Sequence, residues 1–159
     1  MSKVKIQSVE QTEKAGLFTI CFENENISEF EKFIQKFKDN AECQRDFQVI
    51  LSALRRMLNT SGFLERYFRP EGKMRDNLYA LPIESGKLRL YCLRMSDCVL
   101  IVGNGGRKTT KTYEESSELS GYVISLQKLD ELIRVAIKNG DVTIEEQTLK
   151  GIETKEFDL

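Results

Sequence analysis

The hydrophobic positions of the first half of the chain predict one strand followed by two helices. Residues 17–22 (LFTICF) are β-branched and aromatic and follow Gly16, as in a short strand. Apolar residues then recur at helical spacing in two segments, with Asp39-Asn40 between them. The two stripes predict a helical hairpin packed on a sheet. The residues that form them are Ile27, Phe30, Phe33, Ile34 and Phe37, then Cys43, Phe47, Ile50, Leu51, Leu54 and Leu58.

The second half predicts three antiparallel strands and a long helix. Residues 77–83, 87–95 and 98–102 are strand-like, and the short turns between them at 84–86 and 96–97 indicate a meander. Leu119, Val123 and Leu126 begin an apolar stripe that predicts a helix over about 114–138, and Asn139-Gly140 ends it.

The order strand, helix, helix, three strands, helix predicts an α+β fold. We expect a small antiparallel sheet with an N-terminal helical hairpin and a long C-terminal helix, in one domain over residues 1–159. Residues 1–15 are polar and read as a loose arm, 59–76 read as an irregular exposed connector, and 141–159 read as an acidic extension in which a short edge strand fits.

Composition excludes several classes of function. The chain has no histidine, which rules out Ser-His-Asp and Cys-His catalysis and removes the commonest metal ligand. None of the four cysteines forms C-x-x-C, and we expect inert core thiols. No apolar run approaches a membrane span, and the N-terminus lacks the apolar region of a secretory signal. A cytoplasmic protein without metal or cofactor is expected.

The net charge of −1 hides an uneven distribution along the chain. Lys and Arg against Asp and Glu give −2 for residues 1–54, +7 for 55–111 and −6 for 112–159. A basic middle between acidic ends suggests a site for a polyanion, while an unevenly charged solvated surface is the other interpretation.

Basic and aromatic residues gather where two of the predicted strands meet. Arg89 and Tyr91 lie on the middle strand of the meander, and Arg107, Lys108, Lys111 and Tyr113 follow the next strand. In an antiparallel pair the end of one strand lies beside the start of its neighbour, so Arg89 and Arg107 converge if their side chains share a face. Clustered cations suit a phosphodiester, and tyrosines suit stacking on bases. The glycines at 103–106 lack the spacing of a Walker phosphate loop.

At these residues the chain resembles the RelE/HigB superfamily of toxins from type II toxin–antitoxin modules. The similar segments are GKMRDNLYALPI (72–83), SGKLRLYCL (85–93) and VLIVGNGGRKTTKTY (99–113), in the family's order and spacing. The resemblance implies a metal-independent endoribonuclease that acts on messenger RNA, often on the ribosome. It also implies neutralisation by a cognate antitoxin, for which a helix-turn-helix protein is one expected form.

The resemblance also assigns roles. Arg89 matches an arginine that holds the scissile phosphate, and Arg107, or Lys108 if the register slips by one, matches a residue that stabilises developing charge. Tyr113 matches a tyrosine that orients or stacks on the nucleotide. The residues expected to help bind substrate are Lys87, Tyr91, Lys111, Lys73 and Arg75.

The chain departs from the family in its general base. RelE-type members carry two lysines where this chain has Ala80 and Pro82, and no histidine replaces them. Lys87, Lys108 and Lys111 are candidate bases if neighbouring cations depress their pKa. Two other functions therefore stay open: a non-catalytic RNA- or protein-binding module, and a structural or regulatory protein whose acidic segment 141–159 docks on a basic partner.

Overall fold

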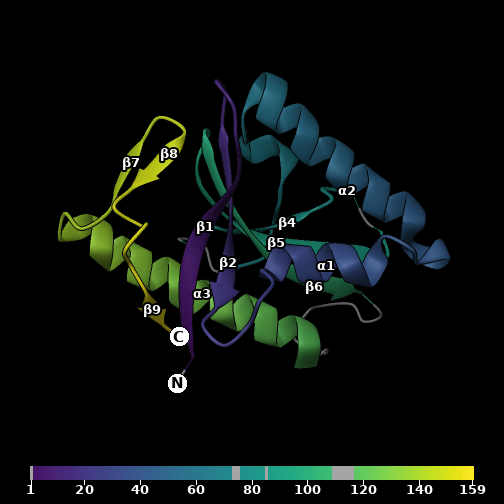
Figure 1. Cartoon of the computed structure of the whole chain (residues 1–159). Coiled ribbons are helices and arrows are strands. Elements are labelled where there is room, and N and C mark those ends of the chain that lie inside the picture. The colour runs from purple at the N-terminus through teal and green to yellow at the C-terminus, as the bar shows by residue number, and fades with distance from the viewer. Residues whose placement is uncertain (1, 73–75, 85, 109–116) are drawn as a thin grey trace.

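A seven-stranded sheet organises the computed structural model, which describes residues 2–72, 76–84, 86–108 and 117–159. The strands lie in the order β3-β4-β5-β6-β2-β1-β9, and all neighbours are antiparallel except β2 and β6, which are parallel (Figure 1). Their bounds are β1 Lys3–Gln11, β2 Gly16–Phe22, β3 Arg69–Pro70, β4 Leu78–Leu81, β5 Leu88–Ser96, β6 Val99–Arg107 and β9 Phe157–Asp158.

Helices cover both faces of this sheet. Helices α1 (Glu29–Phe37) and α2 (Gln44–Arg56) pack on one face, and α3 (Ser117–Lys138) packs on the other (Figure 1). Strand β5 is buried on both sides, with Leu88, Leu90 and Cys92 in the core under α1 and α2. Tyr91 and Leu93 belong to the core under α3. The two faces match the alternation of Leu88, Leu90 and Cys92 with Arg89, Tyr91 and Leu93 along the sequence.

The N-terminus is a strand, so the predicted fold class is wrong in its most prominent feature. Val4 and Ile6 are buried, and β1 pairs with the whole length of β2, where a loose arm was expected over residues 1–15. The signal is short: Val4 and Ile6 alternate with Lys3 and Lys5, and the rest of β1 is exposed. The helical hairpin consequently follows a β-hairpin and does not open the chain.

The sheet is also larger than expected because the C-terminal residues join it. After α3 the chain forms a hairpin of β7 (Thr143–Glu145) and β8 (Thr148–Lys150), then β9 on the outer edge of β1. Val142, Leu149, Ile152 and Phe157 are buried in the core under α3. The predicted order from strand through helical hairpin and meander to long helix does occur, between β2 and α3.

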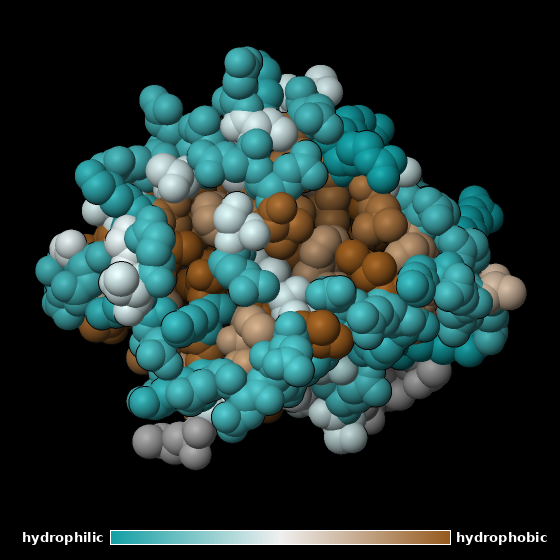
Figure 2. All heavy atoms as spheres, in the orientation of Figure 1, coloured by the Kyte–Doolittle hydropathy of each residue, from teal (hydrophilic) through white to brown (hydrophobic). Residues whose placement is uncertain are grey.

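Three short elements link α2 to β4 and complete the chain path. A π-helical turn (Met57–Ser61) extends α2, a 3-10 turn (Glu65–Tyr67) follows, and β3 then pairs with β4. A further 3-10 turn (Ala41–Cys43) separates α1 from α2. In the face seen in Figure 2, apolar side chains gather in the middle and hydrophilic ones surround them. No helix in the described ranges is long and apolar enough to cross a membrane.

Candidate functional site

Arg89 and Arg107 lie on opposite faces of the sheet, contrary to the expectation that they converge. Arg89 lies opposite Gly106 and Arg107 opposite Leu88 in the β5–β6 ladder, and directly opposed residues share a face. The cause is a register shift between the Leu90–Gly105 and Cys92–Val102 pairs, where β6 has one more residue than β5. Without this β-bulge, Arg107 would lie on the face of Arg89.

Arg107 is committed to a carboxylate. Its Nη1 donates to Glu42 Oε2 at 2.7 Å, and its Nη2 donates to Glu42 Oε1. The hydrogen bonds from Arg107 lower the pKa of Glu42, and those to Glu42 raise the pKa of Arg107. The pair ties the turn between α1 and α2 to the end of β6. Arg107 therefore has a structural partner on the side away from Arg89.

Arg89 lies among other charged groups on the α3 face, and its side chain is only 1% exposed. Arg69 shares this face, because Arg69 lies opposite Ala80 and Ala80 lies opposite Tyr91. Glu71 Oε1 lies 3.8 Å from Nε of Arg69 and 3.8 Å from Nε of Arg89. Arg69 is about one-third exposed, so the group opens to solvent on its side of the sheet.

Lys108 is the fourth member of this group. Its backbone N–H donates to Lys87 O at 2.6 Å and continues the β5–β6 ladder by one bond. Burial lowers the pKa of Lys108, and the charges of Arg89 and Arg69 lower it further while Glu71 opposes them. The bulge that turns Arg107 away thus brings the next residue toward Arg89. We call Arg69, Glu71, Arg89 and Lys108 the cationic cluster.

The cationic cluster leaves hydrogen-bonding capacity unused. Arg69 Nη1 and Arg89 Nε are buried and have no hydrogen-bond partner among the described residues. The 3.8 Å separations from Glu71 are ion-pair distances and too long for hydrogen bonds. Arg89 Nη1 donates to Leu88 O at 2.9 Å. Burial lowers the pKa of Arg89, as does the charge of Arg69. Buried cations with unpaired N–H groups are costly, and an anion would satisfy them.

The other expected site residues do not join this cluster in the described structure. Tyr91 is buried in the core under α3. Lys87 is exposed, lines a hollow beside α2, and its backbone N–H donates to Asp46 Oδ2. Lys73, Arg75, Lys111 and Tyr113 fall outside the described residues.

Arg69 and Glu71 were missed because the connector 59–76 shows no periodicity. Strand β3 is only two residues long, which is too short to leave an alternating pattern. The only available signal was the density of basic residues in this part of the sequence. Ala80, which lies opposite Arg69 in the ladder, is fully buried.

A second polar group joins α1 to α3, and its members satisfy one another. Lys36 Nζ donates to Gly105 O at 2.7 Å and to Tyr122 Oη at 3.1 Å, and Tyr122 Oη donates to Glu118 Oε1 at 3.4 Å. Burial lowers the pKa of Lys36 despite the nearby Glu118, and burial with the Glu118 charge raises the pKa of Tyr122 to about 12. Asn104 Nδ2 donates to the buried Glu29 at 3.3 Å. These contacts position β6. The exception is Glu29 Oε2, which is buried and accepts no hydrogen bond from the described residues, although Lys32 Nζ forms an ion pair with it at 2.7 Å.

Comparisons with family models, curated proteins and solved structures find no match for this chain. Within the described ranges no group of three or more Cys, Asp and Glu side chains is arranged to hold a metal ion. The cationic cluster, an anion site by its chemistry, is therefore the candidate functional site.

Proposed function

We propose that the cationic cluster binds the sugar–phosphate backbone of RNA and that the protein is a metal-independent endoribonuclease. The observation that carries this proposal is a pair of buried guanidinium nitrogens, Arg69 Nη1 and Arg89 Nε, that form no hydrogen bond within the part of the chain that the structure describes. Two planar guanidinium groups beside an ammonium group fit the charge and the oxygen geometry of a phosphodiester. The basic segment of the chain supplies both arginines.

The cluster contains the groups that cleavage by the ribose 2′-hydroxyl requires. The 2′-oxygen bonds to phosphorus while the bond from phosphorus to the 5′-oxygen breaks, which leaves a 2′,3′-cyclic phosphate and a 5′-hydroxyl. Glu71 accepts the proton from the 2′-hydroxyl, and Lys108 donates a proton to the leaving 5′-oxygen. The lowered pKa of Lys108 makes it a stronger acid for that step. Arg69 and Arg89 stabilise the negative charge that develops on the phosphorane.

The sequence resemblance supports the same function. Arg89 stands where RelE/HigB toxins carry the arginine that holds the phosphate, and the bulge in β6 makes Lys108 its neighbour after the strand, which is the one-residue shift allowed above. By the same resemblance, we include in the proposal messenger RNA as the substrate and a cognate antitoxin as the inhibitor.

One observation favours a second function, binding without cleavage. Residue 80 is an alanine where RelE-type members carry a lysine, and it is fully buried opposite Arg69. If Glu71 does not take over proton transfer, the cluster would hold RNA without cutting it.

The two functions are separated by incubating the purified full chain with end-labelled RNA in EDTA, with and without ribosomes. We expect new 5′-hydroxyl ends, and we expect Glu71→Gln to slow cleavage about 100-fold while RNA binding persists. Glu31→Gln, an exposed carboxylate on α1, is the matched control. Retained binding without new ends in the wild type would establish the second function, and neither binding nor cleavage would overturn both.

A further inference from the structure

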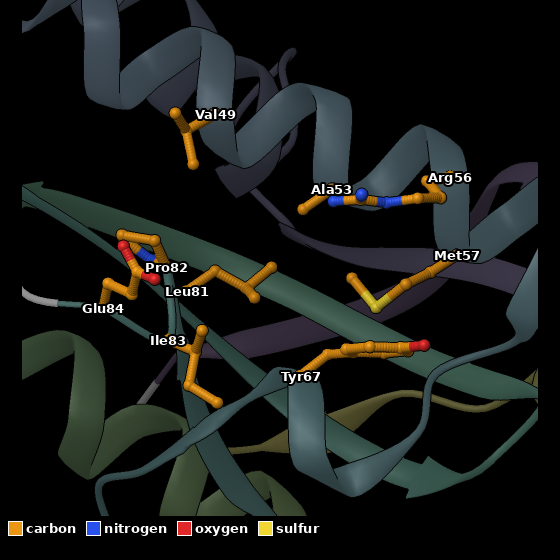
Figure 3. Close-up of a pocket in the computed structure, with 9 residues that line it drawn as sticks. All are labelled: Val49, Ala53, Arg56, Met57, Tyr67, Leu81, Pro82, Ile83 and Glu84. Atoms are coloured by element: carbon orange, nitrogen blue, oxygen red, sulfur yellow. The ribbon is translucent and has the colours of Figure 1, made fainter.

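An apolar groove runs between α2 and the chain that leaves β4. It encloses about 250 Å³. Val49 and Ala53 project from α2, and Met57 projects from the π-helical turn that extends it, while Tyr67, Leu81 and Ile83 line the other side (Figure 3). Leu81 and Met57 are buried and form the floor. The groove lies on the α2 side of the sheet, whereas the cationic cluster lies on the α3 face.

Two large apolar side chains that line the groove are exposed to solvent. Val49 is 47% exposed and Ile83 is 48% exposed, and they come from different elements that face the same hollow. The other exposed large hydrophobic residues in the described ranges are Val9, Ile124 and Val135, which line none of the described hollows. Two of the five exposed large hydrophobic residues of the described ranges therefore converge on this one apolar hollow.

Charges of opposite sign mark the two ends of the groove. Arg56 lies toward the C-terminal end of α2, and Glu84 lies at the other end, beyond Pro82 (Figure 3). Beyond Glu84 the hollow continues into a polar stretch that includes Arg45, Asp46 and Lys87. A bound segment with an acidic end and a basic end would therefore bind in one direction only.

The backbone around the groove favours a helix over an extended peptide. Leu81 already pairs with Leu90, and Pro82 has no N–H, so the chain below α2 offers little of the ladder that an added strand needs. Helix α2, with 13 residues, is about 20 Å long and can support a partner helix of three to four turns.

We propose that this groove receives an amphipathic helix from another protein. Apolar side chains at positions i, i+3 or i+4, and i+7 fill the hollow between Val49 and Ile83. An acidic residue near the helix C-terminus pairs with Arg56, and a basic residue near its N-terminus pairs with Glu84. This orientation also places the negative end of the helix dipole at Arg56 and the positive end at Glu84. The proposal does not depend on the ribonuclease function.

A displayed library of helix-forming peptides of about 14 residues, selected on the full chain, tests the proposal. The selected peptide is labelled, and its Kd is measured by fluorescence anisotropy. We expect Val49→Asp and Ile83→Asp each to raise Kd about 10-fold or more. Val135→Asp, an equally exposed valine on α3, is the matched control and leaves Kd unchanged. Because both groove residues are exposed, these variants keep the fold, which circular dichroism verifies.

Charge reversal tests the orientation. Arg56→Glu should weaken a peptide with a C-terminal glutamate, and replacing that glutamate by lysine should restore binding. Failure to select any peptide, or selected peptides insensitive to both Val49→Asp and Ile83→Asp, would overturn the proposal. Sedimentation showing a dimer of this chain that Val49→Asp dissociates would overturn it in favour of a second copy as the occupant.

Discussion

Arg89 and Arg107 lie on adjacent strands but face opposite sides of the sheet, because Arg89 lies opposite Gly106 and Arg107 lies opposite Leu88. One arginine is buried among cations, and the other is exposed and bonded to Glu42. Two arginines that the sequence treats alike therefore have different physical roles, and matched substitutions distinguish them.

We expect Arg89→Gln to lower the rate of RNA cleavage about 100-fold and Arg107→Gln to change it less than about 3-fold. The first change removes a guanidinium from the cationic cluster, and the second removes a partner of Glu42 on the other face. The rates are measured on one labelled RNA, and growth arrest on induced expression gives a second readout. Equal losses in both variants would contradict the assignment of the site to the α3 face.

Arg89→Met should leave the free energy of unfolding unchanged or raise it by up to about 3 kcal/mol, although it abolishes activity. The wild-type guanidinium is buried, and its Nε has no hydrogen bond to any described residue, so a flexible apolar chain of similar length removes that cost. Arg94→Met on the same strand is the control. Arg94 Nε donates to Phe63 O at 2.8 Å and Nη2 to Asp97 Oδ1 at 2.6 Å, so its loss should cost about 1–2 kcal/mol.

Urea unfolding followed by circular dichroism measures both variants. A loss of stability in Arg89→Met as large as that in Arg94→Met would show that Arg89 is a structural residue with adequate partners. In that case the burial of Arg89 would carry no free-energy cost that a bound anion could relieve.

The sequence predicted the faces of β5 but not the partner of Arg89 across the ladder. Leu88, Leu90 and Cys92 alternate with Arg89 and Tyr91, and this period of two in the sequence is typical of a β-strand. The β-bulge in β6 has no such signal, because Gly103, Gly105 and Gly106 are compatible with a regular strand end and with a bulge alike. Because the bulge adds one residue to β6, Lys108 and not Arg107 lies on the face of Arg89.

Ile6→Ala should lower the free energy of unfolding by about 2–4 kcal/mol, because Ile6 is buried in the core under α3. Lys5→Ala, at the neighbouring exposed position of β1, should change it by less than about 0.5 kcal/mol. Thermal and urea unfolding of both variants measure the difference. If residues 1–15 were a loose arm, the two substitutions would be equally silent.

The N-terminal strand was missed because its buried residues are few. Only Val4 and Ile6 of β1 are buried, so the remaining polar positions dominate any window along the sequence. What holds the strand is long-range pairing with β2 and β9, which no local pattern records. The same applies to Arg69 and Glu71. They lie near Arg89 only because β3 pairs with β4 and β4 pairs with β5.

Tyr122→Phe should remove a fall in stability that the wild type shows at alkaline pH. The folded pKa of Tyr122 is about 12, against 10.0 in the unfolded chain, because of burial and then the charge of Glu118. Between these values the unfolded state loses the phenolic proton while the folded state keeps it, so stability is fully present below pH 10 and is lost as the pH rises toward 12.

The difference in unfolding free energy between wild type and Tyr122→Phe should shrink by about 1–2 kcal/mol from pH 9 to 12, less than the full shift implies because the side chain is partly exposed. Lys36, whose pKa burial lowers, contributes with the opposite sign. Because its Nζ donates to Tyr122 Oη, the same comparison in a Lys36→Met background isolates the phenol. Urea titrations at each pH supply the values. A constant difference across this range would mean that Tyr122 ionises in the folded protein as readily as in the unfolded chain, and that the contact between α1 and α3 through Lys36 and Glu118 leaves its hydroxyl in water.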